Sequence, residues 1–251
     1  MEKKVKRKPY LSVIIPAYNE VRRLPLTLVD IEKHLSRVKY SYEIIVVNDG
    51  SKDGTAEAVK RFSSIVKNLC LIDNEVNKGK GGVVKQGMLA AEGEYRIFVD
   101  ADNSTSIDQF NKMIPFLKEG YDVVIGSRDA EGAELIPPQP WYRRILGNVG
   151  NLIIQALLLP GIWDTQCGFK CFSKEAADKI FPLQKISGWG FDVEILSLAK
   201  ELGYKIKEIP VKWVNDLRSK VSWSAYVKVL WETLKIRAWL WLDVYKIKGR
   251  T

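Results

Sequence analysis

Two aspartates placed one residue apart are the clearest candidates for chemistry in this sequence. Asp100 and Asp102 directly follow an apolar run that ends at Val99. Carboxylates at positions i and i+2 can converge on one hard divalent cation, which usually completes its coordination shell with water and substrate phosphates. The pair therefore indicates a phosphorylated ligand. An isolated Asp-x-Asp is more often a turn or a helix cap, so the neighbouring motifs decide its meaning.

Further polar motifs follow the other expected strands, and two of them suit a phosphorylated nucleotide. Residues 78–82, Lys-Gly-Lys-Gly-Gly, combine mobile backbone amides, two ammonium groups and a helix start, which suit a pyrophosphate. Asp49 lies in a turn, where its carboxylate could bond a base or ribose or could simply form an Asx turn. The motifs are PAYNE (16–20), VNDGSKDGT (47–55), NKGKGG (77–82) and VDADN (99–103), each at the end of an expected strand.

The elements that must position these motifs alternate between strand and helix. Apolar runs predict buried strands at residues 10–15, 43–47, 69–73, 94–99 and 122–125, and Pro16 is expected to end the first. Helical patterns lie between them at residues 24–38, 55–67, 83–91 and 108–118. This alternation predicts an α/β fold with a mostly parallel sheet, in which ligands bind at the carboxyl ends of the strands. The motifs should therefore share one edge of the sheet.

The pattern is less regular beyond Gly126. Residues 129–140 are polar and then proline-rich, which predicts a mobile loop over the site. Helices are expected at 143–159, 174–181 and 191–202, and strands at 167–172 and 205–213. From Trp223 to Tyr245 an amphipathic helix is expected, either docked on the domain or lying in a membrane interface. Its apolar stripe comprises Val227, Leu230, Leu234, Ala238 and Trp241, with basic residues beside it.

Length and composition limit the possible organisation and partners. The chain of 251 residues suits a basic segment (1–9), one large domain (10–220) and a helical appendage (221–251). A formal charge of +9 favours anionic partners: phosphorylated substrates, acidic lipid surfaces or nucleic acid. No recognised nucleic-acid-binding motif is present, so nucleic acid is not expected. Three cysteines favour a reducing, cytoplasmic setting, and no apolar run is long enough to predict a transmembrane helix.

The motifs from Pro16 to about Lys220 closely resemble those of inverting glycosyltransferase family 2, whose Rossmann-like nucleotide-sugar-binding fold is called GT-A. Residues 164–170 (DTQCGFK) and 190–194 (GFDVE) look like segments of dolichyl-phosphate β-glucosyltransferases, with dolichyl-phosphate mannose synthases as close relatives. The resemblance implies transfer of a hexose from UDP-glucose to dolichyl or another polyprenyl phosphate, by an enzyme peripheral to the cytosolic membrane face. A GDP-mannose donor and a sugar-to-sugar transfer are the alternatives.

The resemblance also implies the donor-side residues. Asp100 and Asp102 would hold Mg²⁺ or Mn²⁺. The mannose synthases carry a glutamine shortly after this pair as a further ligand, but Asn103 begins that stretch here, so the third protein ligand stays open. The nucleotide sugar would be bound by Pro16, Tyr18, Glu20, Asp49, Lys80 and Asp100.

On the acceptor side the resemblance implies a set of cations and a hydroxyl. These residues are Arg128, Arg143, Arg144, Ser219 and Lys220. A guanidinium group can clamp two phosphate oxygens at once. The expected catalytic residues are Asp102, Asp192 and Arg128. Asp192 would be a general base if the acceptor were a sugar hydroxyl. A phosphomonoester has a second pKa of about 6 and needs no base, so Asp192 would then position a loop, cap a helix or bind substrate.

Overall fold

The central element is a seven-stranded sheet in the order β3-β2-β1-β4-β7-β5-β8. The computed structural model describes residues 8–137, 141–214 and 223–247, with the side chains of 141–146, 148 and 223–225 not described. The strands are β1 (Leu11–Ala17), β2 (Tyr42–Asp49), β3 (Leu69–Asn74), β4 (Tyr95–Val99), β5 (Val123–Ser127), β7 (Phe169–Ser173) and β8 (Ile206–Pro210). Only β7 runs antiparallel to its neighbours β4 and β5 in this sheet, so the predicted mostly parallel α/β fold is confirmed.

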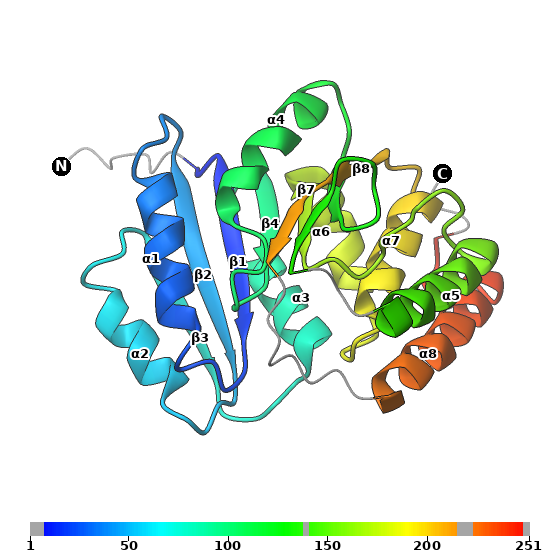
Figure 1. Ribbon diagram of the computed structural model, residues 1–251, viewed down its shortest axis with the longest axis horizontal. Helices are drawn as coiled ribbons and strands as arrows, with labels where there is room; N and C mark the ends of the chain where they lie inside the picture. The colour runs from blue at the N-terminus through cyan, green and yellow to red at the C-terminus, as the bar shows by residue number, and fades with distance from the viewer. Residues whose placement is uncertain (1–7, 138–140, 215–222, 248–251) are drawn as a thin grey trace.

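Helices cover both faces of the sheet (Figure 1). They are α1 (Leu24–Leu35), α2 (Thr55–Phe62), α3 (Lys80–Ala90), α4 (Phe110–Lys118) after a 3-10 turn η1 (Ile107–Gln109), α5 (Trp141–Leu157), α6 (Lys174–Leu183), α7 (Phe191–Glu201) and α8 (Trp223–Trp241). One core contains apolar side chains of α1, α2 and α4, and the other contains those of α3, α5, α6, α7 and α8. Strand β1 serves both, since Ile14 faces the α3 side and Val13 and Ile15 face the α1 side.

A second, two-stranded parallel sheet joins β6 (Glu134–Ile136) to β9 (Lys212–Val214). The mobile loop expected at 129–140 is therefore wrong for residues 134–136, while 138–140 lie outside the described residues. The single strand expected at 205–213 is likewise two strands, β8 and β9, separated at Val211. Strands β6 and β9 have three residues each and lie more than 70 residues apart in the chain, so their pairing leaves no recognisable pattern of apolar residues in the sequence.

Two boundaries near the motifs also differ from expectation. Pro16 does not end β1, which continues to Ala17; pairing with β4 stops at Ile14, so Pro16 lies beyond that ladder. Helix α3 begins at Lys80 rather than Val83, directly after Gly79. Gly79 has a left-handed φ of 81°, and a side chain there would strike the backbone of Ser187. Lys80 therefore stands at a helix start.

Candidate active site

The polar motifs meet at one edge because β1, β2 and β4 are adjacent and parallel. The loops after β1 and β2 are joined by hydrogen bonds. The Asn19 N–H donates to Ser51 Oγ at 2.9 Å, and the Glu20 N–H donates to Thr55 Oγ1 at 2.9 Å. Tyr18 is exposed beside them, next to Pro16 and Ala17 at the end of β1. This arrangement places Pro16, Tyr18 and Glu20 beside the loop that follows Asp49, and their role in binding the nucleotide stays a prediction.

Asp49 anchors the loop that precedes α3. Its buried carboxylate accepts a hydrogen bond from the Lys78 N–H at 2.5 Å, and its carbonyl accepts one from Asn77 Nδ2 at 3.2 Å. Burial raises the pKa of Asp49, although the bonds from this loop oppose the shift. The structure thus joins two of the sequence motifs, VNDGSKDGT and NKGKGG, through this side chain.

Lys80 reaches from the start of α3 to the end of β4. Its Nζ lies 2.6 Å from Asp100 Oδ1. Burial alone would lower the pKa of Lys80, but the charges of Asp100 and Asp192 outweigh it and raise the pKa. The ring of Trp189 lies 5.3 Å from the ammonium group and is 48% exposed. Trp189 was missed by sequence reasoning, because a lone tryptophan in a loop has no informative spacing.

Asp102 lies beside Asp100 but keeps its own environment. It accepts the Ser104 N–H at 3.0 Å, and its Oδ2 is 3.8 Å from Arg23 Nη1. Burial, followed by the like charge of Asp100, raises the pKa of Asp102. Arg23 was also not predicted, since it stands outside the PAYNE motif.

These two carboxylates fit a divalent cation. Both offer hard oxygen ligands, and a cation would relieve the like-charge interaction that raises the pKa of Asp102. Gly168 lies so close that a Cβ there would come within 2.0 Å of Asp100 Oδ2. No cluster of three or more histidine, cysteine or acidic residues suited to a metal occurs in the part of the chain that the structure describes. Asn103 Nδ2 donates to Asp30 Oδ2 at 3.1 Å, and diphosphate and water oxygens would complete such a site.

Asp192 forms a buried ion pair at the start of α7. Lys170 Nζ donates to Asp192 Oδ1 at 2.5 Å and to the Cys167 carbonyl at 2.6 Å. Burial raises the pKa of Asp192, and Lys170 and Lys80 oppose that rise. Because Asp192 is only 3% exposed and already paired, this geometry favours a positioning role over that of a free general base.

Arg128 is committed to a carboxylate of its own chain. Its Nε and Nη2 donate to the two oxygens of Asp164 at 2.7 and 2.8 Å, and its guanidinium stacks 5.0 Å from Trp213. Burial opposes ionisation of Asp164, but Arg128 outweighs it and holds the pKa of that carboxyl below its usual value. Arg128 therefore orders the loop after β5. Its Nη1 is not part of the two-bond contact with Asp164.

The other acceptor-side residues are not brought together by the described structure. Arg143 and Arg144 belong to α5, but their side chains are not described, and Ser219 and Lys220 lie outside the described residues. Their role in acceptor binding stays a prediction.

Known proteins are similar to this chain over most of its length. The model of the family described as "Glycosyl transferase family 2" matches residues 12–181. A dolichyl-phosphate beta-glucosyltransferase of Dictyostelium discoideum is 40% identical, over 96% of this chain and 77% of that protein. The enzyme of the same name from Homo sapiens is 33% identical, over 85% of this chain and 71% of its own length.

Solved structures agree on the fold. Glucosyl-3-phosphoglycerate synthase from Mycobacterium tuberculosis, in complex with UDP, aligns with a TM-score of 0.66 and 19% identity, over 92% of this chain and 80% of that chain. The same enzyme with Mn²⁺, UDP and glucosyl-3-phosphoglycerate aligns with a TM-score of 0.65 and 20% identity, over 91% of this chain and 80% of that chain. At this level of identity the likeness concerns the fold.

Proposed function

The chain belongs to glycosyltransferase family 2, and on that basis we propose that it transfers glucose from UDP-glucose to dolichyl or another polyprenyl phosphate. The observation that carries this proposal is the convergence of Lys80, Asp100 and Asp102 at one edge of the sheet, in a chain similar over nearly its whole length to dolichyl-phosphate beta-glucosyltransferases. UDP is supported as the nucleotide by the glucosyl donor that those names imply and by the UDP-bound structural neighbours.

The reaction replaces one bond to the anomeric carbon by another. An acceptor phosphate oxygen forms a bond to C1 of glucose as the bond from C1 to the UDP oxygen breaks, with inversion. The acceptor oxygen is already an anion near neutral pH, so no side chain has to remove a proton. This fits a chain in which Asp192 is paired with Lys170.

The described residues would act mainly by placing charge. A Mg²⁺ or Mn²⁺ ion held by Asp100 and Asp102 would neutralise the departing diphosphate. The Lys80 ammonium group supplies a further positive charge beside Asp100, at a helix start that itself favours anions. Asp49 keeps the preceding loop in place, and the half-exposed ring of Trp189 offers a flat apolar surface for the hexose.

We further propose that the enzyme works at the cytosolic face of a membrane, with α8 in the interface. Val229, Ile236 and Leu240 of α8 are buried in the core. Four members of the apolar stripe predicted for this helix, together with Trp231, instead face outward: Val227, Trp231, Leu234, Ala238 and Trp241. Helix α5 lies beside α8 (Figure 1). It also exposes Val149, Leu152 and Ile153. None of the described helices is long and apolar enough to cross a membrane.

The charge of the chain also supports a location at the cytosolic face of a membrane. Cytoplasmic leaflets carry anionic lipids that attract basic proteins, and the formal charge here is +9. An interfacial helix would bring the site to an acceptor that cannot leave the bilayer.

The experiment that tests the reaction is a donor screen with product analysis. The purified chain is incubated with polyprenyl phosphate and either UDP-glucose or GDP-mannose, with neutral glycans as competing acceptors. We expect a hexosyl polyprenyl phosphate, identified by mass, from UDP-glucose. Transfer only from GDP-mannose would show that the donor is GDP-mannose and not UDP-glucose. Transfer only to glycans would overturn the proposed acceptor.

A further inference from the structure

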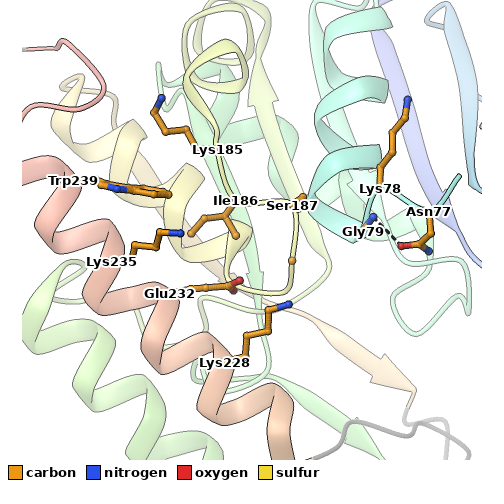
Figure 2. Close-up of a pocket in the computed structure, with 11 residues that line it drawn as sticks. Asn77, Lys78, Gly79, Lys185, Ile186, Ser187, Lys228, Glu232, Lys235 and Trp239 are labelled. Atoms are coloured by element: carbon orange, nitrogen blue, oxygen red, sulfur yellow. Dashed lines mark hydrogen bonds between the residues drawn. The ribbon is translucent and has the colours of Figure 1, made fainter.

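A cationic cleft of about 400 Å³ lies between α8 and two loops of the donor side (Figure 2). Its walls are Lys228, Glu232, Lys235 and Trp239 of α8, the loop 185–188, and residues 77–79 before α3. The cleft is separate from the Asp100 and Asp102 pair. Neither aspartate lines it, and the backbones of Gly79 and Ser187, which do, pack closely together, since a Cβ on Gly79 would come 2.5 Å from the Ser187 carbonyl oxygen.

The lysines around this cleft are not equivalent. Lys78 Nζ is bonded to Asn74 Oδ1 at 2.6 Å, and Lys185 Nζ lies 5.9 Å from the ring of Tyr245, so both turn away from the cavity. Lys228 and Lys235 point toward the loop 185–188 in Figure 2. Within the described ranges neither has a carboxylate at ion-pair distance, and Lys235 stacks 4.6 Å from the ring of Trp239.

The single acid of the cleft is already used. Glu232 Oε2 accepts the Gly190 N–H at 2.8 Å and so ties α8 to the loop that carries Trp189. Gly188 permits this approach, because a Cβ there would lie 3.0 Å from Glu232 Oε1 and 3.5 Å from Lys228 Nζ. Glu232 keeps one negative charge, so Lys228, Lys235 and Glu232 together leave a net positive charge in the cleft, which favours an anion.

The position of the cleft indicates where the anion comes from. Lys228 and Lys235 each stand one residue from the outward apolar stripe, next to Val227 and Leu234, so the cleft opens beside that stripe. A lipid whose chains lay along the stripe would bring its phosphate to these two lysines. We propose that this cleft binds the phosphate group of a membrane lipid through Lys228 and Lys235, neither of which is assigned to the transfer reaction.

Binding there would also connect the membrane to the donor loops. The cleft is lined by Asn77 and Gly79 of the loop before α3 and by the residues that lead to Trp189. Its occupancy would brace both loops, so lipid phosphate should raise turnover. This last consequence rests on the proposed transfer function, whereas lipid binding does not.

The test compares Lys228→Gln/Lys235→Gln with Lys33→Gln/Lys39→Gln, which removes the same charge at exposed positions within and after α1, on the other face of the sheet. Vesicle sedimentation uses neutral phosphatidylcholine alone, with phosphatidylserine, or with polyprenyl phosphate. We expect the cleft variant to lose about tenfold or more of its binding to one or both phosphate-bearing additions, and the control to lose little. The addition affected identifies the lipid.

A second comparison separates the cleft from general attraction. Lys235→Gln and Arg237→Gln each remove one positive charge from α8, but only Lys235 lines the cleft. Equal losses in these two variants, or in the two double variants, would overturn the proposal, as would no loss at all. Calorimetric binding of inorganic phosphate that only the cleft variant loses, with unchanged vesicle binding, would assign the cleft to a free anion instead. Because binding is measured without donor, failure here is distinct from failure of the donor screen.

Discussion

Lys170 Nζ and Asp192 Oδ1 lie 2.5 Å apart in the interior, near enough to the Lys80–Asp100 contact for the charge of Asp192 to raise the pKa of Lys80. Both side chains are almost fully buried. Removing one member of such a pair leaves an uncompensated buried charge, which typically costs about 3–5 kcal/mol of stability. Replacing both members is often nearly neutral for stability. The pair therefore offers a way to separate structure from proton transfer.

We expect Asp192→Asn to lower the unfolding temperature by roughly 10 °C. This follows from a loss of about 3–5 kcal/mol of stability, with each kcal/mol lowering the unfolding temperature by about 2–4 °C. Lys170→Met/Asp192→Asn should recover most of that stability and, with it, much of the transfer to polyprenyl phosphate. A general base is worth about 10² to 10⁴ in rate. If the double variant were stable but its rate fell by about 10² to 10⁴, Asp192 would be the general base and the acceptor would be a hydroxyl group.

Replacing Asp102 tests the metal site. Asp102→Asn should reduce Mn²⁺- or Mg²⁺-dependent turnover by about 10²-fold or more, since the cation stabilises charge on the leaving diphosphate. The unfolding temperature should hold or rise, because burial and Asp100 make the ionised Asp102 unfavourable in the fold, as its raised pKa indicates. The exposed Asp108→Asn is the matched control. Full activity in chelator would contradict the assignment.

Trp189 should matter for the hexose more than for the nucleotide. Trp189→Ala is expected to raise the KM for UDP-glucose about three- to tenfold, and Trp189→Phe, which keeps a flat ring, should change it little. Calorimetric affinity for UDP should stay within about twofold in both. Trp163→Ala, at another exposed tryptophan, provides the control. An equal loss of UDP affinity would show that the ring acts through Lys80.

The Arg128–Asp164 pair predicts how stability depends on pH. The pKa of Asp164 is lowered in the fold by Arg128, so the pair contributes stability above the unfolded pKa of about 3.9 and loses it as pH falls through the lower folded pKa. Asp164→Asn should be less stable by about 3 kcal/mol at pH 7 and should show a shallower loss in acid. Urea unfolding between pH 7 and pH 2.5 measures this difference. Parallel curves for the two proteins would refute it.

The outward stripe of α8 predicts binding to membranes. Trp231→Ser/Leu234→Ser should reduce partitioning to neutral vesicles by more than about tenfold, since two large apolar side chains leave the interface. Leu26→Ser/Ile65→Ser removes comparably exposed apolar groups from another part of the surface and should have little effect. If both variants bound vesicles equally well, the stripe would have a different partner.

The sequence by itself determined the order of the elements and the edge on which the motifs gather. Strands buried on both faces read as apolar runs, and the polar residues that follow them must lie at their carboxyl ends. Asp49, Lys80, Asp100 and Asp102 were all singled out by this logic, and the structure brings Lys80 to Asp100 at that edge.

The tertiary structure decided which charges are free to act. Asp192 is paired with Lys170, 22 residues away, and Arg128 with Asp164, 36 residues away, and no spacing rule connects such partners. It also decided the orientation of α8. That helix has apolar side chains around most of its circumference, so periodicity could not choose between Val227, Leu234 and Trp241, which face outward, and Val229, Ile236 and Leu240, which pack inward. Burial depends on which surface the helix meets, and only packing against α5 and α7 supplies that surface.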